Sequence, residues 1–222
     1  MRNPSYMSNE KSALLYYVFT KKENCRLNME TTPVTDETTP AQEKARLRQF
    51  LKQKRGELPQ RLRPEYDRAI RERLLEQAAP AGTVFCYVST DMEVDTRGII
   101  DCLRQSGIKV LIPRILNREK MIAAGFDGWN TLRAGQLGIL TPDSDKEWPG
   151  EADLCITPGL GFTPDGRRIG YGRGYYDKWF ATHPHTARIA LCYECQIVDD
   201  MPVTDTDVRV QQIITERRII TC

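Results

Sequence analysis

The residues best suited to chemistry cluster in one stretch, Pro158–Asp177, which reads PGLGFTPDGRRIGYGRGYYD. It holds six glycines, where average usage of roughly 7% would give about one. Glycine allows positive φ and the close approach of another group. Residues 163–166 predict a tight turn, because proline presets φ there, and a helix is expected to start at Tyr175. Backbone N–H groups that glycines leave accessible at a helix N-terminus, beside Arg167 and Arg168, suit an anion such as a polyphosphate.

The glycine spacing separates this stretch from the common phosphate motifs. It lacks the Gly-x-x-x-x-Gly-Lys-Ser/Thr of a Walker loop, and its Gly-x-Gly-x-Gly differs from the dinucleotide fingerprint. Glycine content alone fits a surface loop without ligand equally well. Residues 167–176 also interleave arginine with tyrosine, a pattern that can bind RNA. The strands expected on either side and a net charge of +2 favour an enclosed active-site loop over RNA binding.

Two aspartates could hold a metal ion. Asp177 ends the glycine stretch, and Asp207 lies in the loop PVTDTD. Mg²⁺ prefers one or two carboxylates together with phosphate oxygens and water. The residues alone favour simpler roles, with Asp177 as a first-turn acid that complements the helix dipole and Asp207 as a loop acid. Glu93 and Asp95 also lie in a loop; a cleft that buried them would let them bind an amino-substituted heterocycle.

The seven cysteines are odd in number and scattered. Cys86 and Cys155 lie inside apolar, strand-like runs, where a free cysteine behaves as a small hydrophobe. This usage predicts a reducing cytoplasm and disfavours a disulfide framework. The Cys-x-x-Cys at 192–195 and the histidines of 183–185 could form a zinc site, but their spacing fits no standard zinc module.

The elements that must position these residues alternate between strand and helix. Thr39 can cap a first helix with Pro40 and Gln42, and Lys44 and Arg48 share one face of it; from the residues alone, a solvated basic face is the favoured interpretation. Strand, helix and strand in succession predict a right-handed crossover in a parallel sheet. The fold class is therefore α/β: a single domain with a mostly parallel, open sheet and helices on both faces. The predicted helices cover 40–55, 64–78, 97–105 and a start at 175–180, and the predicted strands cover 83–89, 108–113, 120–126, 153–157, 187–193 and 211–215.

The domain is expected to span 39–222, after an N-terminal extension at 1–38. The extension is polar and Thr-rich from residue 30 to 39, so we expect it to be poorly ordered. A secretory signal is disfavoured, and a true start at Met29 would also explain the segment. No apolar run approaches the roughly 20 residues of a spanning helix, and a charged fraction of 28% demands neither a membrane nor a nucleic acid partner.

Ligands of open α/β sheets bind at the carboxyl ends of the strands. The loop 89–95 and the glycine stretch both begin at such ends, so we expect them to face one site. The pieces PGLGF at 158–162 and GRRIGYGRGYYD at 166–177 resemble the signature of the 5-formyltetrahydrofolate cyclo-ligase family, and the resemblance runs from about residue 43 to 216. It implies a Rossmann-like, three-layer fold.

The resemblance also implies an activity: an ATP- and Mg²⁺-dependent closure of 5-formyltetrahydrofolate to 5,10-methenyltetrahydrofolate, with release of ADP and phosphate. Its small-molecule substrates are the expected partners. From the resemblance together with the composition and the cysteine usage, we expect no nucleic acid or membrane partner, a monomer and a cytoplasmic location. A folate- or nucleotide-binding protein without catalysis remains an alternative on the same fold. The sequence departs from the family at Thr163-Pro164, where many members have Asp after the Phe, and at Arg173, where Gly or Lys is usual.

Residue roles follow from the same resemblance. Lys44 and Arg168 are the expected catalytic residues. Metal ligation is expected of Asp177 and Asp207. The ATP site is expected to comprise Lys44, Arg48, Arg168, Ile169, Gly170, Tyr171, Gly172, Arg173, Gly174, Tyr175 and Tyr176. The folate site is expected to comprise Thr90, Glu93, Asp95, Tyr171, Gly172, Arg173, Gly174 and Tyr175.

Overall fold

The first helix begins at the predicted cap. The computed structural model describes residues 39–222 except 91, 136–137 and 139, so the predicted extension at 1–38 lies outside the described residues. Helix α1 spans Pro40–Gly56. Its capping box is formed as predicted: Gln42 N donates to Thr39 Oγ1 at 3.3 Å, and Thr39 N donates to Gln42 Oε1 at 2.8 Å. These bonds satisfy backbone donors that a helix start leaves open.

A seven-stranded sheet forms the centre of the described domain, in the order β11-β10-β9-β6-β1-β2-β3. The five strands from β10 to β2 pair in parallel, while the edge strands β3 and β11 pair antiparallel to their neighbours. The predicted open, mostly parallel sheet is therefore confirmed. The strands are β1 Thr83–Cys86, β2 Lys109–Ile115, β3 Met121–Gly125, β6 Leu154–Thr157, β9 Ala187–Leu191, β10 Gln212–Ile214 and β11 Ile219–Thr221.

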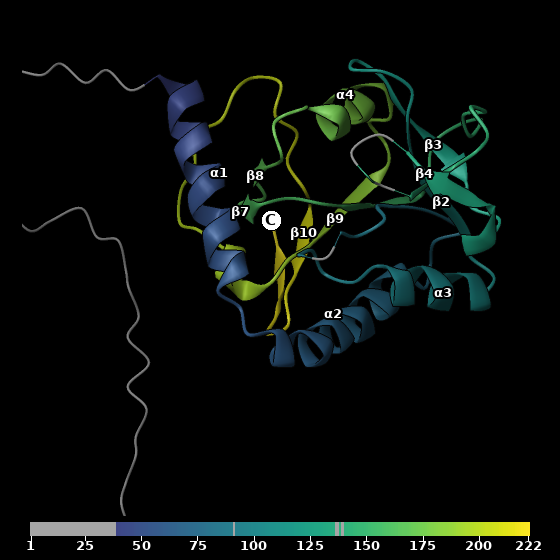
Figure 1. The fold of residues 1–222 in the computed structure, drawn as a ribbon, viewed down its shortest axis with the longest axis horizontal. Helices are drawn as coiled ribbons and strands as arrows, with labels where there is room; N and C mark the ends of the chain where they lie inside the picture. Colours follow the sequence, from purple (N-terminus) through teal and green to yellow (C-terminus); the bar gives the residue numbers. More distant parts are fainter. Residues whose placement is uncertain (1–38, 91, 136–137, 139) are drawn as a thin grey trace, which may run out of the picture. The chain divides into compact units, whose positions relative to one another are not determined.

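Helices cover both faces of the sheet (Figure 1). Helices α2 (Arg63–Ala78) and α3 (Arg97–Gln105) pack on one face, where Val84 and Cys86 of β1 meet them. Helix α4 (Tyr175–Thr182) packs on the other face against Phe85. Successive β1 side chains thus enter opposite layers, as expected for a strand buried on both faces. Full burial of a side chain such as Phe85 stabilises the fold by about 1.5–3 kcal/mol.

Several short elements were not predicted from the sequence. Predicted strand 83–89 ends at Cys86, and the last strand, β11, was missed. Strands of two or three residues carry too little periodicity for pattern reasoning to find. The unpredicted short elements are β4 Leu132–Ala134, β5 Leu140–Pro142, β7 Gly161–Phe162, β8 Arg168–Ile169 and the 3₁₀ helices Gln60–Leu62, Trp129–Thr131 and Glu194–Gln196.

None of the helices in the described part of the chain has the length and apolar character needed to cross a membrane.

The predicted tight turn at 163–166 joins β7 to β8. Gly166 N donates to Thr163 O at 2.9 Å, and Gly166 has a φ of +85°. A Cβ on Gly166 would overlap with the carbonyl oxygen of Val210, so glycine is required for both reasons. The turn sets the direction in which β8 delivers the glycine-rich segment that follows.

Candidate active site

A pocket of about 960 Å³ lies at the carboxyl ends of β1, β2 and β6. Tyr87, Val88, Thr90 and Glu93 line it after β1, and Pro158 lines it directly after β6. This is the edge at which open α/β sheets bind ligands. All the sequence-predicted site residues except Asp95 line this pocket, so the structure brings together segments that are far apart in the chain.

Helix α1 supplies two cations to the pocket. Lys44 Nζ lies 2.5 Å from Asp207 Oδ2, and the Lys44 side chain is only 13% exposed. One turn later, Arg48 Nε donates to the carbonyl oxygen of Gly170 at 3.0 Å. The interpretation of this helix face as a solvated basic surface is therefore wrong. The residue types could not show it, because a lysine and an arginine on one face look the same whether water or a loop covers them.

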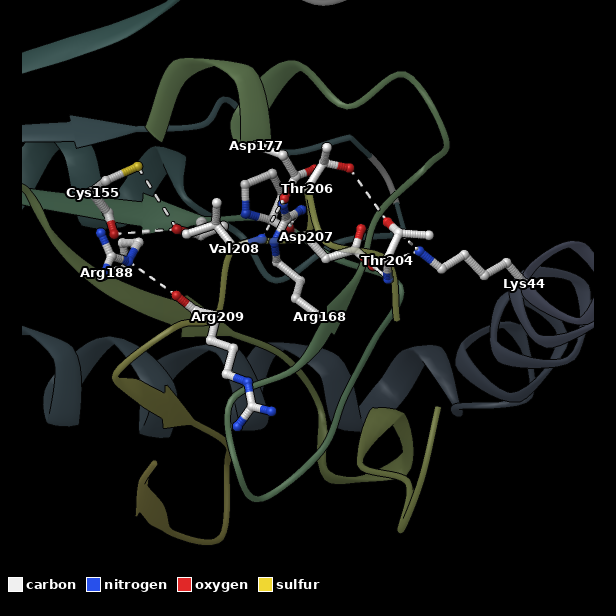
Figure 2. Close-up of polar contacts among 12 residues, drawn as sticks. Lys44, Cys155, Arg168, Asp177, Arg188, Thr204, Thr206, Asp207, Val208 and Arg209 are labelled. Atoms are coloured by element: carbon white, nitrogen blue, oxygen red, sulfur yellow. Dashed lines mark hydrogen bonds and ion pairs between the residues drawn. The ribbon is translucent and has the colours of Figure 1, made fainter. Parts of the chain in front are cut away.

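Arg168 and Asp177 form a buried ion pair beside that contact. Arg168 Nη2 lies 2.6 Å from Asp177 Oδ1, and its side chain is 4% exposed. The backbone N–H of Val208 donates to the same Asp177 oxygen at 3.2 Å. Figure 2 shows how this bond brings the segment that carries Asp207 next to Asp177. Strand β8 and helix α4 thus meet the 204–208 loop at one point.

The two aspartates keep part of their surface open. One oxygen of Asp177 accepts Arg168 and Val208 N, and one oxygen of Asp207 accepts Lys44 and the N–H of Thr204. Among the described residues, no hydrogen bond is recorded to the second oxygen of either carboxylate. Partial burial by itself would raise the pKa of Asp207, but the hydrogen bonds from Lys44 and Thr204 and the charge of Lys44 together lower it.

The glycine-rich loop reaches α4 through two left-handed residues. Gly172 has a φ of +100°, and Gly174, the N-cap of α4, has a φ of +67°. Arg48 packs within 3.5 Å of the position where a Gly172 Cβ would stand. Because Gly174 has no side chain, no side-chain cap covers the start of α4. The loop and the first turn of α4 line the pocket and offer backbone donors suited to an anion.

Glu93 lines the pocket from the loop that follows β1, and both of its carboxylate oxygens are held. Its Oε2 accepts the N–H of Thr90 at 2.8 Å and the Thr90 hydroxyl at 3.0 Å, while its Oε1 accepts the hydroxyl of Tyr171 at 2.6 Å. Asp95 has a different place. Its Oδ1 accepts the N–H of Arg97 at 3.0 Å, at the start of α3, and it does not line the pocket.

Tyr176 lies inside the pocket wall with its ring stacked on Phe85, the two centroids being 5.9 Å apart. Its hydroxyl is buried and has no hydrogen-bond partner among the described residues. Burial raises the pKa of Tyr176 well above its usual value, so the hydroxyl stays protonated. A ligand acceptor would satisfy this donor.

Sequence reasoning missed the apolar wall of the pocket. These side chains carry no chemical signature, and only their position at strand ends could have indicated them. They give one half of the pocket a surface on which a flat heterocycle can pack. The wall comprises Tyr87, Val88, Pro113, Ile115 and Met121.

The fold and the pocket define an α/β protein with a large pocket at the carboxyl edge of its sheet, lined by cations and glycines that suit an anion. Residues 40–216 match the family model described as the 5-formyltetrahydrofolate cyclo-ligase family. The match covers more than half of the chain, and the chain belongs to this family.

Individual relatives agree with this membership. A Caenorhabditis elegans protein described as a "probable 5-formyltetrahydrofolate cyclo-ligase" is 29% identical over 194 residues, covering 80% of this chain and 94% of the relative. An Arabidopsis thaliana "5-formyltetrahydrofolate cyclo-ligase, mitochondrial" is 28% identical, covering 88% and 85%. The solved structure of an Aquifex aeolicus 5,10-methenyltetrahydrofolate synthetase superposes with a TM-score of 0.70 at 22% identity, covering 80% and 92%, which shows the same fold.

Proposed function

We propose that the pocket between α1, the 87–93 loop and the glycine-rich loop is where this chain performs its family's reaction. Enzymes of the family close 5-formyltetrahydrofolate to 5,10-methenyltetrahydrofolate at the expense of ATP, and this chain is a ligase of that class. One observation carries the site assignment: two cations of α1, the buried Arg168 and the glycine loop border the same space as Glu93 and the apolar wall. A polyanion and a heterocycle can therefore lie side by side.

The chemistry needs an activated formyl group. A formyl amide is a poor electrophile, because its nitrogen donates into the carbonyl. Attack of the formyl oxygen on the γ-phosphorus of ATP breaks the bond to ADP and leaves an imidate-like phosphate. N10 of the folate then attacks the formyl carbon and loses its proton, the C–O bond breaks, and phosphate leaves as the ring closes.

The protein supplies position and positive charge for these steps. Lys44, Arg48, Arg168 and Arg173 balance the charge of the polyphosphate, and the backbone N–H groups of the glycine loop hold the transferred phosphoryl group. Glu93 orients the folate, and Tyr175 or Tyr176 packs on a ring. The assignment of Asp95 to the folate rests on the family resemblance alone.

Asp177 and Asp207 fit a role as Mg²⁺ ligands. They are neighbouring hard-oxygen donors, and each keeps one oxygen without a recorded protein partner in the described structure. Mg²⁺ takes one or two carboxylates and completes its shell with phosphate oxygens and water. When bound, it would neutralise charge on the phosphate oxygens. Lys44 and Arg168, which now contact these carboxylates, would then be available to the nucleotide.

We also propose that the enzyme acts as a monomer in the cytoplasm. Light scattering after gel filtration tests the first proposal. Cell fractionation tests the second, and a signal in mitochondria, the location in the name of the Arabidopsis relative, would contradict it.

The direct test mixes purified protein, Mg-ATP and 5-formyltetrahydrofolate and follows the near-ultraviolet absorbance of the methenyl product together with ADP release. Product and ADP should appear in equal amounts, and omission of ATP should abolish both. Tight folate or nucleotide binding by folded protein without ADP release would instead identify a binding protein. Steeply salt-dependent RNA affinity would revive the RNA-binding alternative for residues 167–176.

A further inference from the structure

Arg55 is a buried cation in the last turn of α1, with only 5% of its surface exposed. Among the described residues, no carboxylate forms a salt bridge with it, and its Nε has no hydrogen-bond partner. A buried guanidinium without a counter-charge is costly. It must therefore gain stabilisation through the groups that it does contact.

Those contacts lead to the pocket through one tyrosine. Arg55 Nη1 donates to the Tyr171 hydroxyl at 2.9 Å, and that hydroxyl donates to Glu93 Oε1 at 2.6 Å. The guanidinium also lies 5.8 Å from the centroid of the Tyr171 ring, within cation–π range. Burial first, and then the charge of Glu93, raises the pKa of Tyr171, so its hydroxyl keeps the proton that it donates.

The hydroxyl of Tyr171 thus connects the positive charge of Arg55 to the carboxylate of Glu93. Glu93 lines the pocket, whereas Arg55 does not. The second Glu93 oxygen is held by Thr90. Both oxygens of the carboxylate are therefore oriented by protein donors, and one of the two donor sets depends on Arg55.

A second arginine, Arg63, connects the end of α1 to the loop that carries Glu93. Arg63 Nη2 donates to the carbonyl oxygen of Arg55 at 2.8 Å, and Arg63 Nη1 donates to the carbonyl oxygen of Met92 at 3.3 Å. The end of α1 and the loop that carries Glu93 are consequently held at a fixed separation. Arg55 can then act on Tyr171 without a large rearrangement of either element.

We propose that Arg55 is a positioning residue that sets the affinity for the folate substrate by holding Tyr171 and Glu93 in one hydrogen-bonded arrangement. The proposal rests on the proposed function, which assigns Glu93 to the folate. It differs from a purely structural role, because it predicts an effect on one substrate and not on the other.

The test measures KM for both substrates, kcat and the direct binding of 5-formyltetrahydrofolate in four variants: Arg55→Met, Tyr171→Phe, the double variant, and Lys52→Met, an exposed position on the same helix. Arg55→Met should raise the folate KM and Kd about tenfold, the size expected for loss of a charge-assisted hydrogen bond. KM for ATP and kcat should change less than about twofold, within the scatter of neutral surface changes. The double variant should be little worse than either single one, since both remove the same chain of bonds. Lys52→Met should match the parent protein.

Three results would overturn the proposal: an unchanged folate KM in Arg55→Met, an equal loss for ATP and folate, or fully additive effects in the double variant. If Arg55→Met does not fold, Tyr171→Phe decides alone, because Tyr171 is 44% exposed and only its hydroxyl is removed. A parent protein that binds folate without turnover would refute the proposed function while leaving the binding comparison decisive. A parent protein that neither binds folate nor turns it over would refute both the proposed function and the role of Arg55.

Discussion

Arg168 Nη2 lies 2.6 Å from Asp177 Oδ1, in a pair whose arginine is 4% exposed and whose aspartate is 21% exposed. The buried cation is thus neutralised by a carboxylate that faces the pocket. A nucleotide can compete for such a cation only if another cation binds the carboxylate in its place. The pairing of Lys44 with Asp207 repeats this arrangement nearby.

Replacement of Arg168 by alanine should cost both stability and turnover. The change leaves Asp177 without its main partner and removes a cation from the proposed phosphate site. Breaking a buried pair costs about 3–5 kcal/mol of stability, and loss of a transition-state donor costs about 10²–10³-fold in kcat. Urea unfolding and steady-state kinetics measure the two effects. Arg167→Ala is the matched control, because Arg167 pairs with Asp165 and Asp200; it should lose stability but keep most of its turnover. An unchanged rate for Arg168→Ala would remove Arg168 from the mechanism.

Replacement of Asp207 by asparagine should weaken the dependence on Mg²⁺. The variant keeps the size of the side chain but loses the charge that a divalent cation requires. We expect the half-saturating Mg²⁺ concentration to rise by about tenfold or more, as for other lost metal-site interactions. Titration of activity with Mg²⁺ at saturating ATP measures it, with Asp205→Asn in the same loop as the comparison. Superimposable titrations of Asp207→Asn and parent protein would exclude Asp207 as a ligand.

Replacement of Gly166 by alanine should destabilise the fold more than the same change at Gly107. The two glycines have nearly equal φ values, +85° and +82°, so the backbone strain is shared, at about 1 kcal/mol. A Cβ at Gly166 would overlap with the Val210 carbonyl, whereas one at Gly107 meets nothing within 4 Å. The difference between the free energies of unfolding of the two variants therefore measures the cost of the overlap. Gly166→Ala should also weaken activity, because Val210 is close in sequence to Asp207. Equal losses at both positions would show that the hairpin tolerates displacement.

The turn that contains Asp165 should lose support in acid. Hydrogen bonds from Thr163 and then Arg167 lower the pKa of Asp165 from 3.8 to about 2. A carboxylate with a lowered folded pKa stabilises the protein above its unfolded pKa, and this contribution disappears as pH falls through the folded value. The stability advantage of the parent protein over Asp165→Asn should thus be constant above about pH 5 and vanish towards pH 2. Urea midpoints across pH 2–6 measure this, and a pH-independent difference would contradict it.

Particular residues show why some features could be predicted from the sequence and others could not. Local signals sufficed where the chemistry is local: the Thr39 cap, the turn at 163–166 and the glycine-led start of α4 all formed as predicted. Arg55 could not be identified, because Tyr171, which accepts its hydrogen bond, lies 116 positions away. Asp95 shows the converse. It lies only two residues from Glu93, yet its carboxylate accepts the N–H of Arg97 at the start of α3 and does not line the pocket.

The contact between α1 and the 204–208 loop joins residues 163 positions apart, Lys44 and Asp207. A nascent chain therefore carries its first pocket cation long before the matching carboxylate has been synthesised. Until then, Lys44 of α1 lacks its acidic partner. Contacts between residues so far apart in sequence form slowly during folding. The Lys44–Asp207 contact that borders the pocket can therefore form only after residue 207 has been synthesised.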